Sequence, residues 1–314
     1  MSEHKLVLID GHALAYRMFF ALPLEAFSTK SGEPTNATYG FTRTILERIL
    51  GDNPPQYFAV SFDVGATFRD AMFAEYKGTR EKMPDELALQ IERIKEVVQA
   101  LNIPILELDG YEADDVLGTI ARQAKPLGVP VHIITGDRDL FQLVDDNTLV
   151  ELPPRKGSGR PELFDTEAVI AYWDVRPDQV VDYKALVGDS SDNIPGVAGV
   201  GPKTAVKLLS EYDTLDGIYT NIESIKGANQ KKLLDGKENA YLSQKLAQIV
   251  TDAPIELDLA ACVAHDFDVN VVLEMFRELD FRSLTKELLE RVETAVDIAA
   301  PVDVAPPTET IIVQ

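Results

Sequence analysis

The first half of the chain alternates between short apolar runs and longer amphipathic stretches. The apolar runs have the length and composition of strands, and they cover residues 5–10, 56–63, 104–110, 129–137 and 147–153. Helical patterns lie between them at about 36–50, 85–101 and 112–125. Strands that alternate with helices are typical of βαβ units. The pattern therefore predicts an α/β fold over residues 1–164, with a mostly parallel central sheet flanked by helices.

From residue 165 onward the pattern changes to mostly helix. Asp165 is placed to cap one helix, and Pro177 stands at the first-turn position of the next. We expect a helical subdomain over residues 165–284. Residues 285–314 are rich in Ala, Val and Pro and have no aromatic side chain, a composition typical of a flexible linker or tail.

Cysteine content and the N-terminal residues narrow the cellular setting. Cys262 is the only cysteine in 314 residues, which excludes an internal disulfide and favours a reduced, cytoplasmic compartment. The apolar run before Asp10 has four residues, too few for a signal peptide or a membrane span. We therefore expect no membrane association.

The net charge of −22 argues at face value against a polyanionic partner. However, a site full of carboxylates reverses its own local charge when it binds divalent cations. Nucleic acid thus stays open as a partner, with weak binding in the absence of metal and strong salt dependence.

Three of the apolar runs end on aspartate, at Asp10, Asp63 and Asp137. Ligands of an open parallel sheet bind beyond the carboxyl ends of its strands, so these three side chains are expected at one rim. A single aspartate at such a position is more often a turn former or a helix cap. Three of them favour a shared site.

The stretch "GYEADDVLG" at 110–118 adds a further group of acids at the start of a predicted helix. Acids in a first turn are favoured by the helix dipole, by roughly 0.3–1 kcal/mol each, which accounts for one or two of them. "TGDRDL" and "GDSSDN" contribute two more pairs. The candidate metal-site carboxylates are Asp10, Asp63, Glu112, Asp114, Asp115, Asp137, Asp139, Asp189 and Asp192.

So many carboxylates at close range cannot all ionise without counter-ions. Oxygen ligands without a Cys or His cluster indicate hard cations, Mg²⁺ or Mn²⁺, rather than zinc. Two or more such ions can activate water and stabilise the leaving oxygen in phosphodiester hydrolysis.

The glycine-rich stretch "NIPGVAGVGPKTAVKLL" at 193–209 nearly matches a P-loop, but Pro202 interrupts the motif and no strand precedes it. The pattern instead favours two helices joined by a glycine hairpin, the second helix starting near Pro202. Its backbone and its free N–H groups would hold a phosphate without reading bases. The candidate DNA-binding residues are Gly196, Gly199, Gly201, Lys203 and Thr204. The alternative is that the glycines only allow two helices to pack closely against each other.

The basic segment 68–84 follows the second strand run. Lys77 and Arg80 would share a helix face and could stabilise charge at a scissile phosphate. Tyr76 could stack on a base. The alternative is a solvated end of an amphipathic helix.

Together these motifs closely resemble the 5′-nuclease domain of bacterial DNA polymerase I, a member of the flap endonuclease family. The matching stretches are 8–22, 62–63, 75–80, 110–121, 134–144 and 187–209. The resemblance implies a PIN-like nuclease core, a helical arch at about 68–102 and a helix–hairpin–helix element at about 187–212. It implies 5′ flap endonuclease and 5′→3′ exonuclease activity with divalent metals.

The resemblance also assigns roles and partners. All nine carboxylates are present, so an active enzyme is expected. Lys77 and Arg80 match the basic pair at the scissile phosphate, while Tyr16, Arg17 and Tyr76 fall in DNA-binding motifs. The implied substrates are DNA with 5′ flaps, nicks or RNA-primed ends, in replication (RNA primer removal) and repair. The resemblance further implies a monovalent ion such as K⁺ in the hairpin, a monomer, and a nucleoid-associated bacterial cytoplasmic protein.

Two alternatives remain on the same scaffold. A non-catalytic duplex DNA-binding module would have no need of the carboxylates, and a single-strand RNA nuclease would have no need of the hairpin. We also expect the chain to be the nuclease portion of a longer protein.

Overall fold

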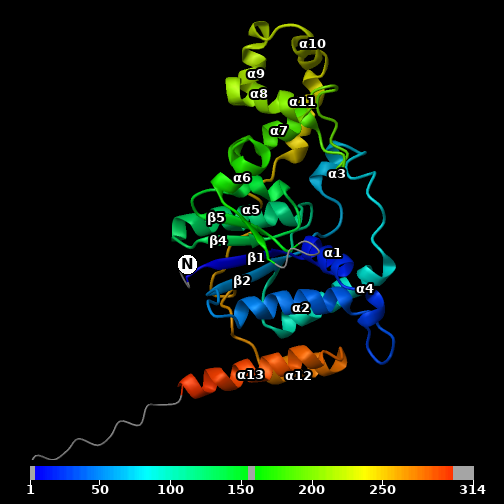
Figure 1. Ribbon diagram of the computed structural model, residues 1–314, viewed down its shortest axis with the longest axis vertical. Helices are drawn as coiled ribbons and strands as arrows, with labels where there is room; N and C mark the ends of the chain where they lie inside the picture. The colour runs from blue at the N-terminus through cyan, green and yellow to red at the C-terminus, as the bar shows by residue number, and fades with distance from the viewer. Residues whose placement is uncertain (1–3, 155–159, 300–314) are drawn as a thin grey trace, which may run out of the picture.

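The computed structural model describes residues 4–154 and 160–299. Its centre is a six-stranded sheet in the order β3-β2-β1-β4-β5-β6 (Figure 1). The strands are β1 Leu6–Asp10, β2 Tyr57–Ser61, β3 Ile105–Leu106, β4 Val131–Ile134, β5 Thr148–Leu152 and β6 Glu162–Phe164. All neighbouring strands are parallel except β6, which pairs antiparallel with β5. The prediction of an α/β fold with a mostly parallel sheet is confirmed.

Helices cover both faces of the sheet because successive strand residues point to opposite sides. Leu6 and Leu8 of β1 pack in the cluster that includes α5 (Ala113–Ala124). Val7 and Ile9 pack in the cluster that includes α2 (Asn36–Ile49) and α4 (Asp85–Ala100). Helix α1 (Gly11–Ala21) lies on the α2 side and begins directly after β1. The three helical patterns expected in this half therefore form at the expected positions.

The helical subdomain stacks beyond α5 (Figure 1). Its helices are α6 Thr166–Trp173, α7 Val180–Val187, α8 Pro202–Tyr212, α9 Leu215–Thr220, α10 Ala228–Asp235 and α11 Lys237–Ala247. Short 3₁₀ turns lie at Leu24–Ala26, Lys125–Leu127, Asp139–Leu143, Pro177–Gln179 and Ile222–Ser224. As expected, Asp165 caps α6, because its carboxylate accepts a hydrogen bond from the Ala168 amide at 2.8 Å.

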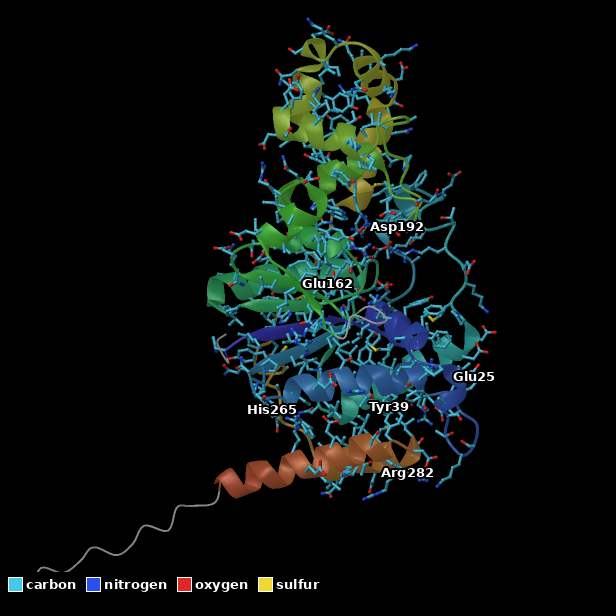
Figure 2. All side chains as sticks on the ribbon, viewed as in Figure 1. Glu25, Tyr39, Glu162, Asp192, His265 and Arg282 are labelled. Atoms are coloured by element: carbon cyan, nitrogen blue, oxygen red, sulfur yellow. The ribbon has the colours of Figure 1, made fainter. Side chains whose placement is uncertain are left out.

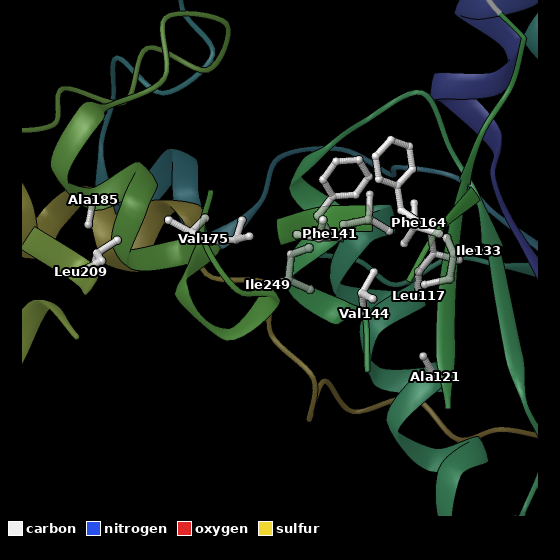
Figure 3. Close-up of a cluster of buried hydrophobic side chains, with 14 of the residues drawn as sticks. Leu117, Ala121, Ile133, Phe141, Val144, Phe164, Val175, Ala185, Leu209 and Ile249 are labelled. Carbon is white, nitrogen blue, oxygen red and sulfur yellow. The ribbon is translucent and has the colours of Figure 1, made fainter. Parts of the chain in front are cut away.

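One apolar cluster joins the sheet to the helical subdomain. Figure 3 shows it running from Ile133 and Leu117 beside the sheet, past Phe141, to Ala185 and Leu209 of the upper helices. The two parts of the chain therefore share a continuous buried core.

The C-terminal region differs from the expected linker. Helices α12 (Val269–Glu278) and α13 (Arg282–Ala299) lie below α2 in Figure 1. Leu284 and Leu288 are buried in the α2–α4 cluster, so the first turns of α13 belong to the core. The prediction of a linker from residue 285 is wrong as far as residue 299, because this stretch belongs to helix α13 and its Leu288 is buried in the core. Residues 300–314 lie outside the described part.

The segment predicted as a helical arch, 68–102, is helical only at its two ends. Helix α3 (Phe68–Met72) is followed by turns over 73–84, and the chain then runs along the edge of the molecule to α4 (Figure 1). Helix α4 packs on α2 through apolar side chains such as Ile94, so it cannot stand free as an arch. In the described part of the chain, no helix is long and apolar enough to cross a membrane.

Candidate active site

The carboxyl ends of β1, β2 and β4 open into a cavity of about 1150 Å³. Seven of the predicted carboxylates line it: Asp10, Asp63, Glu112, Asp114, Asp137, Asp139 and Asp189. They come from three strand ends, from the N-terminus of α5, from the 3₁₀ turn Asp139–Leu143 and from the loop after α7. The cavity thus brings together Asp10 and Asp189, which lie 179 residues apart in the sequence.

Asp10 and Asp63 are fixed by hydrogen bonds at the rim of the sheet. Asp10 caps α1 by accepting from the Ala13 amide at 3.0 Å, and it accepts from the Thr135 hydroxyl at 2.8 Å. Asp63 accepts from the Ala113 amide at 2.7 Å, so it also caps the first turn of α5. His12 lies 3.4 Å from the Asp63 carboxylate. Asp10 and Asp63 therefore each cap a helix and also line the shared site.

Burial and mutual repulsion shift the pKa values of the carboxyl groups in the cavity. Burial raises the pKa of Asp10 to about 6 and, together with Asp137, raises that of Asp139 to about 8. Burial also raises the pKa of Asp114, and the charge of Asp10 adds to the effect. Asp63 differs, because the His12 and Ala113 contacts outweigh burial and lower its pKa to about 2. The cavity therefore favours added positive charge.

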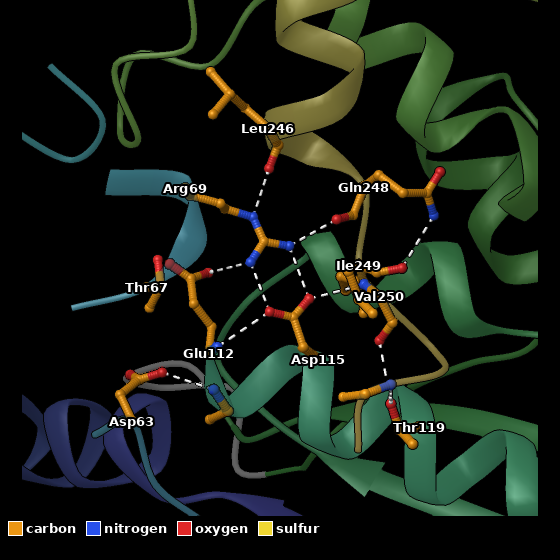
Figure 4. A network of polar contacts seen from close by, with 12 residues as sticks. Asp63, Thr67, Arg69, Glu112, Asp115, Thr119, Leu246, Gln248, Ile249 and Val250 are labelled. Atoms are coloured by element: carbon orange, nitrogen blue, oxygen red, sulfur yellow. Dashed lines mark hydrogen bonds and ion pairs between the residues drawn. The ribbon is translucent and has the colours of Figure 1, made fainter. Parts of the chain in front are cut away.

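Asp115 has different surroundings from its neighbour Asp114. Its carboxylate is fully buried and does not line the cavity. It forms a two-pronged ion pair with Arg69 at 2.6 and 2.8 Å and accepts from the Val250 amide at 2.8 Å (Figure 4). Arg69 also donates to the carbonyls of Leu246 and Gln248. This buried network ties α3 and α5 to the segment after α11.

The basic turn, residues 73–84, carries Lys77 and Arg80 to the carboxylates. Lys77 donates to Glu112 at 2.7 Å, and Arg80 donates to Asp192 at 2.5 Å. The expected helix across these two residues does not form, since Lys77 has φ +53° and its amide is bonded to the Asp192 carbonyl at 2.9 Å. Figure 2 shows Asp192 beside α3, near the base of this turn. Both cations nevertheless reach the site.

Tyr76 is not available to stack on a base in this conformation. Its side chain is buried, and its hydroxyl lies 3.3 Å from Glu112 and 3.4 Å from Asp192. The stacking role expected for Tyr76 is therefore wrong for the structure described, because the ring fills the space behind the two carboxylates.

Tyr16 and Arg17 of α1 also line the cavity. Arg17 donates to the carbonyls of Pro153 and Pro154, at 2.9 and 2.5 Å. Tyr16 stacks on Phe20, whose side chain is 70% exposed. Sequence reasoning missed Phe20, although the i, i+4 spacing from Tyr16 was a readable signal.

Lys184 is a second residue that sequence reasoning missed. It lies on α7, is buried, and lines the cavity with its ammonium between Asp139 and Asp189. The Asp189 oxygen is 2.6 Å from its Nζ atom. No local pattern marks this lysine, because one of its two partners is 45 residues away.

The glycine hairpin forms between α7 and α8, and α8 begins at Pro202 as expected, whereas the first helix lies at 180–187, before the expected range of 187–212. Asp189 and Ile194 exchange backbone hydrogen bonds at 2.9 and 2.7 Å, which closes the loop in front of the hairpin. Gly201 caps α8 and Lys203 is exposed in its first turn, so both are accessible to an anion.

Gly196 has a different role from the phosphate contact expected. It is buried, has φ +61°, and a side chain there would lie 2.3 Å from the Gly188 nitrogen. Its amide donates to the Ser243 hydroxyl at 2.9 Å. Gly196 thus provides the close packing of two backbone segments, whereas Gly199 is the exposed glycine of the hairpin.

Comparison with known families decides the classification. The family model for the N-terminal, resolvase-like domain of 5′–3′ exonucleases matches residues 5–174, and the model for their C-terminal SAM fold matches residues 175–270. The chain belongs to the 5′–3′ exonuclease family. The predicted activity class, a 5′→3′ exonuclease and therefore a hydrolase, is confirmed.

Curated relatives of this 5′–3′ exonuclease chain are bacterial polymerases. DNA polymerase I of Chloroflexus aurantiacus is 46% identical over 315 residues, covering 98% of this chain and 33% of the relative. DNA polymerase I of Bacillus subtilis is 42% identical over 323 residues, covering 98% of this chain and 36% of the relative. The chain thus spans about a third of the length of these relatives.

Solved structures share the fold of the 5′–3′ exonuclease chain. A T5 5′-exonuclease with bound zinc has a TM-score of 0.64 at 21% identity, covering 91% of this chain and 98% of that one. The catalytic core of Rad2 in complex with DNA substrate has a TM-score of 0.60 at 18% identity, covering 94% and 92%. These likenesses support the predicted nuclease fold.

The carboxylates of the 5′–3′ exonuclease site have the chemistry of ligands for hard cations. Within residues 4–154 and 160–299, no three Asp, Glu, His or Cys side chains are grouped to hold one metal ion. Lys77, Arg80 and Lys184 each hold an oxygen of a predicted metal-site carboxylate. The donor set fits Mg²⁺ or Mn²⁺ because it consists of carboxylate oxygens gathered at one rim, where Asp10 and Asp139 have raised pKa values.

Proposed function

We propose that this chain is a structure-specific 5′ nuclease that hydrolyses phosphodiesters at the 5′ ends and 5′ flaps of DNA with two or more Mg²⁺ or Mn²⁺ ions. The observation that supports this is the convergence of seven carboxylates in one cavity that two cations of the basic turn also reach. Membership of the 5′–3′ exonuclease family supports cleavage in the 5′→3′ direction. The corresponding cellular task is removal of RNA primers and damaged 5′ ends by a monomer in the bacterial cytoplasm.

The residues that would hold the ions are those that line the cavity. Asp10, Asp114 and Asp137 are the best candidates, because none has a Lys or Arg ion pair among the described residues. Ions bound there would supply activation of water and stabilisation of the leaving oxygen. Asp115 is better suited to hold Arg69 behind the site, because both of its oxygens are already bonded.

Lys77 and Arg80 would act on the substrate. Each now neutralises a carboxylate, and divalent ions would take over that task. The two side chains are only partly buried, at 26% and 46% exposure, so they can turn to a phosphate. A cation beside the reacting phosphate stabilises the charge that develops in the transition state.

The hairpin would hold the duplex beside the cleavage site. Gly199, Gly201 and the first turn of α8 offer an exposed backbone and a helix N-terminus, and Lys203 adds a charge there. Such contacts position a DNA backbone without reading its sequence. Tyr16 and Phe20 of α1 offer aromatic faces that line the same cavity.

Cleavage of a labelled 5′-flap duplex tests the proposal. We expect 5′-phosphorylated products with Mg²⁺, none with EDTA, and none from Asp114→Asn. Unstructured RNA at equal concentration serves as the competing substrate. Binding of the duplex without cleavage under Mg²⁺ or Mn²⁺ would instead indicate a non-catalytic DNA-binding module.

A further inference from the structure

Lys184 is a buried cation that the proposed reaction does not use. Its side chain is 6% exposed, and its ammonium contacts two carboxylates of the cavity, Asp139 at 17% exposure and Asp189 at 19%. Asp139 follows β4 in the nuclease core, whereas Asp189 follows α7 in the helical subdomain. The lysine therefore bridges the two parts of the site.

Burying an ammonium costs free energy that only close pairing can offset. Here two carboxylates supply that pairing, and the Ser191 amide and hydroxyl complete the bonding of Asp189 at 2.8 and 2.5 Å. The position between Asp139 and Asp189 is thus built for a cation, with oxygen ligands converging from two elements.

The three basic side chains of the site differ in what they can do once ions are bound. Lys77 and Arg80 lie on the basic turn and are 26% and 46% exposed, so their side chains are free to change partner. Lys184 instead projects from α7, whose neighbouring residues Ala185 and Leu186 are fully buried in the core. Its ammonium is therefore aimed at the carboxylates by a fixed helix.

We propose that Lys184 occupies the place of a divalent ion between Asp139 and Asp189, and that an ion must displace it to bind there. This inference rests on the proposed metal-dependent function. It divides the cavity into two halves. The half around Asp10, Asp114 and Asp137 binds its ion first, whereas the half around Asp139 and Asp189 binds more weakly because the lysine competes.

Calorimetric titration of the DNA-free chain with Mn²⁺ tests the competition. The variant is Lys184→Met, which keeps the length of the side chain and removes its charge. Arg138→Met is the matched control, because Arg138 lines the same cavity but contacts the ring of Tyr172 rather than a recorded carboxylate. Both variants remove one positive charge from the cavity wall.

We expect Lys184→Met to bind the weaker Mn²⁺ about tenfold or more tightly than the parent, since one full charge leaves contact distance of two ligands. Arg138→Met should change that affinity far less. The fluorescence of Trp173, the only tryptophan, should report the same shift, because this residue lines the cavity and stacks on Tyr183 beside Lys184.

The outcomes separate the inference from the function on which it rests. If the parent and Lys184→Met bound the weaker Mn²⁺ equally well, the proposal that Lys184 competes with the ion would be wrong. The same holds if both variants gained Mn²⁺ affinity equally. Absence of Mn²⁺ binding in every protein would overturn the proposed function instead. Lys184→Gln repeats the test if Lys184→Met fails to fold, and melting curves monitor folding of each variant.

Discussion

Asp114 and Asp115 are adjacent in the sequence, but they face different partners. Asp114 lines the cavity among other acids, and burial and their charges raise its pKa. Asp115 is fully buried against Arg69. A short acidic motif thus contains one residue suited to bind a cation from solution and one that binds a cation of the protein itself.

Substitution by asparagine should separate these two roles. Asp115→Asn removes the charge of the nearer partner of the buried Arg69 and leaves Glu112, at 3.6 Å, as its remaining carboxylate, so we expect a loss of at most about 3–5 kcal/mol in the free energy of unfolding. Asp114→Asn relieves repulsion and should keep the stability of the metal-free chain while abolishing cleavage. Urea unfolding and the flap assay measure both effects. Equal stability losses in the two variants would contradict the division.

Lys77 and Arg80 should affect turnover rather than folding. We expect Lys77→Ala and Arg80→Ala each to lower kcat by about 10²–10³-fold, as removal of a transition-state donor does elsewhere. Lys82→Ala is the control, because Lys82 pairs with Asp85 at the exposed end of the same turn and should change little. Single-turnover kinetics on the flap duplex check this, and a Lys82 effect of similar size would argue against a specific role.

At the scale of the element, helix α8 presents its N-terminus and Lys203 to solvent. We expect Lys203→Ala to weaken duplex binding and to reduce the slope of log K against log salt by about 0.9, the value for one phosphate contact. Lys207→Ala, one turn further along the same helix, is the matched control. Binding titrations between 50 and 200 mM salt, roughly the range in which such slopes are measured, give the result. An unchanged slope for Lys203→Ala would show that Lys203 does not contact a phosphate.

Much of the architecture was predictable because its signals are local. Strand-end aspartates, amphipathic periods and the glycine hairpin each occupy a few consecutive residues, and parallel pairing then brings Asp10, Asp63 and Asp137 to one rim. The Arg69–Asp115 pair joins residues 46 apart, so no period or motif indicates it. The site role of Lys184 was missed for the same reason, since its partner Asp139 is also distant in the sequence. The part of helix α13 after residue 284 was missed for another reason, since the composition of 285–314 resembles a linker and only tertiary packing buries Leu288.

At the scale of the molecule, the acidic cavity should make the metal-free chain less stable as pH rises. The folded pKa of Asp10 is about 6 and that of Asp139 is about 8, both above the value of about 3.9 for an unfolded aspartate. The folded state therefore binds protons that the unfolded state releases. The stability that these protons contribute is complete below about pH 4 and is lost as pH rises toward 8.

Thermal melts in EDTA check this expectation. We expect the Tm of the parent to fall between pH 5 and pH 8, and the fall to be smaller for the double variant Asp10→Asn, Asp139→Asn. Saturating Mg²⁺ should raise the Tm most at pH 8, since bound ligand stabilises by about 2.7 kcal/mol at a hundredfold excess over its Kd. The same pH slope in the parent and the double variant would contradict the assignment.

The loop that carries Asp189 and the hairpin that carries Lys203 form one short segment of chain. Backbone bonds between Asp189 and Ile194, and the contact of Gly196 with Gly188, make this segment stiff. Under the proposed function, this segment would set the distance between the place where a duplex is held and the place where it is cut. Because contacts to the DNA backbone carry no base information, the cleavage position should then be the same for every base sequence.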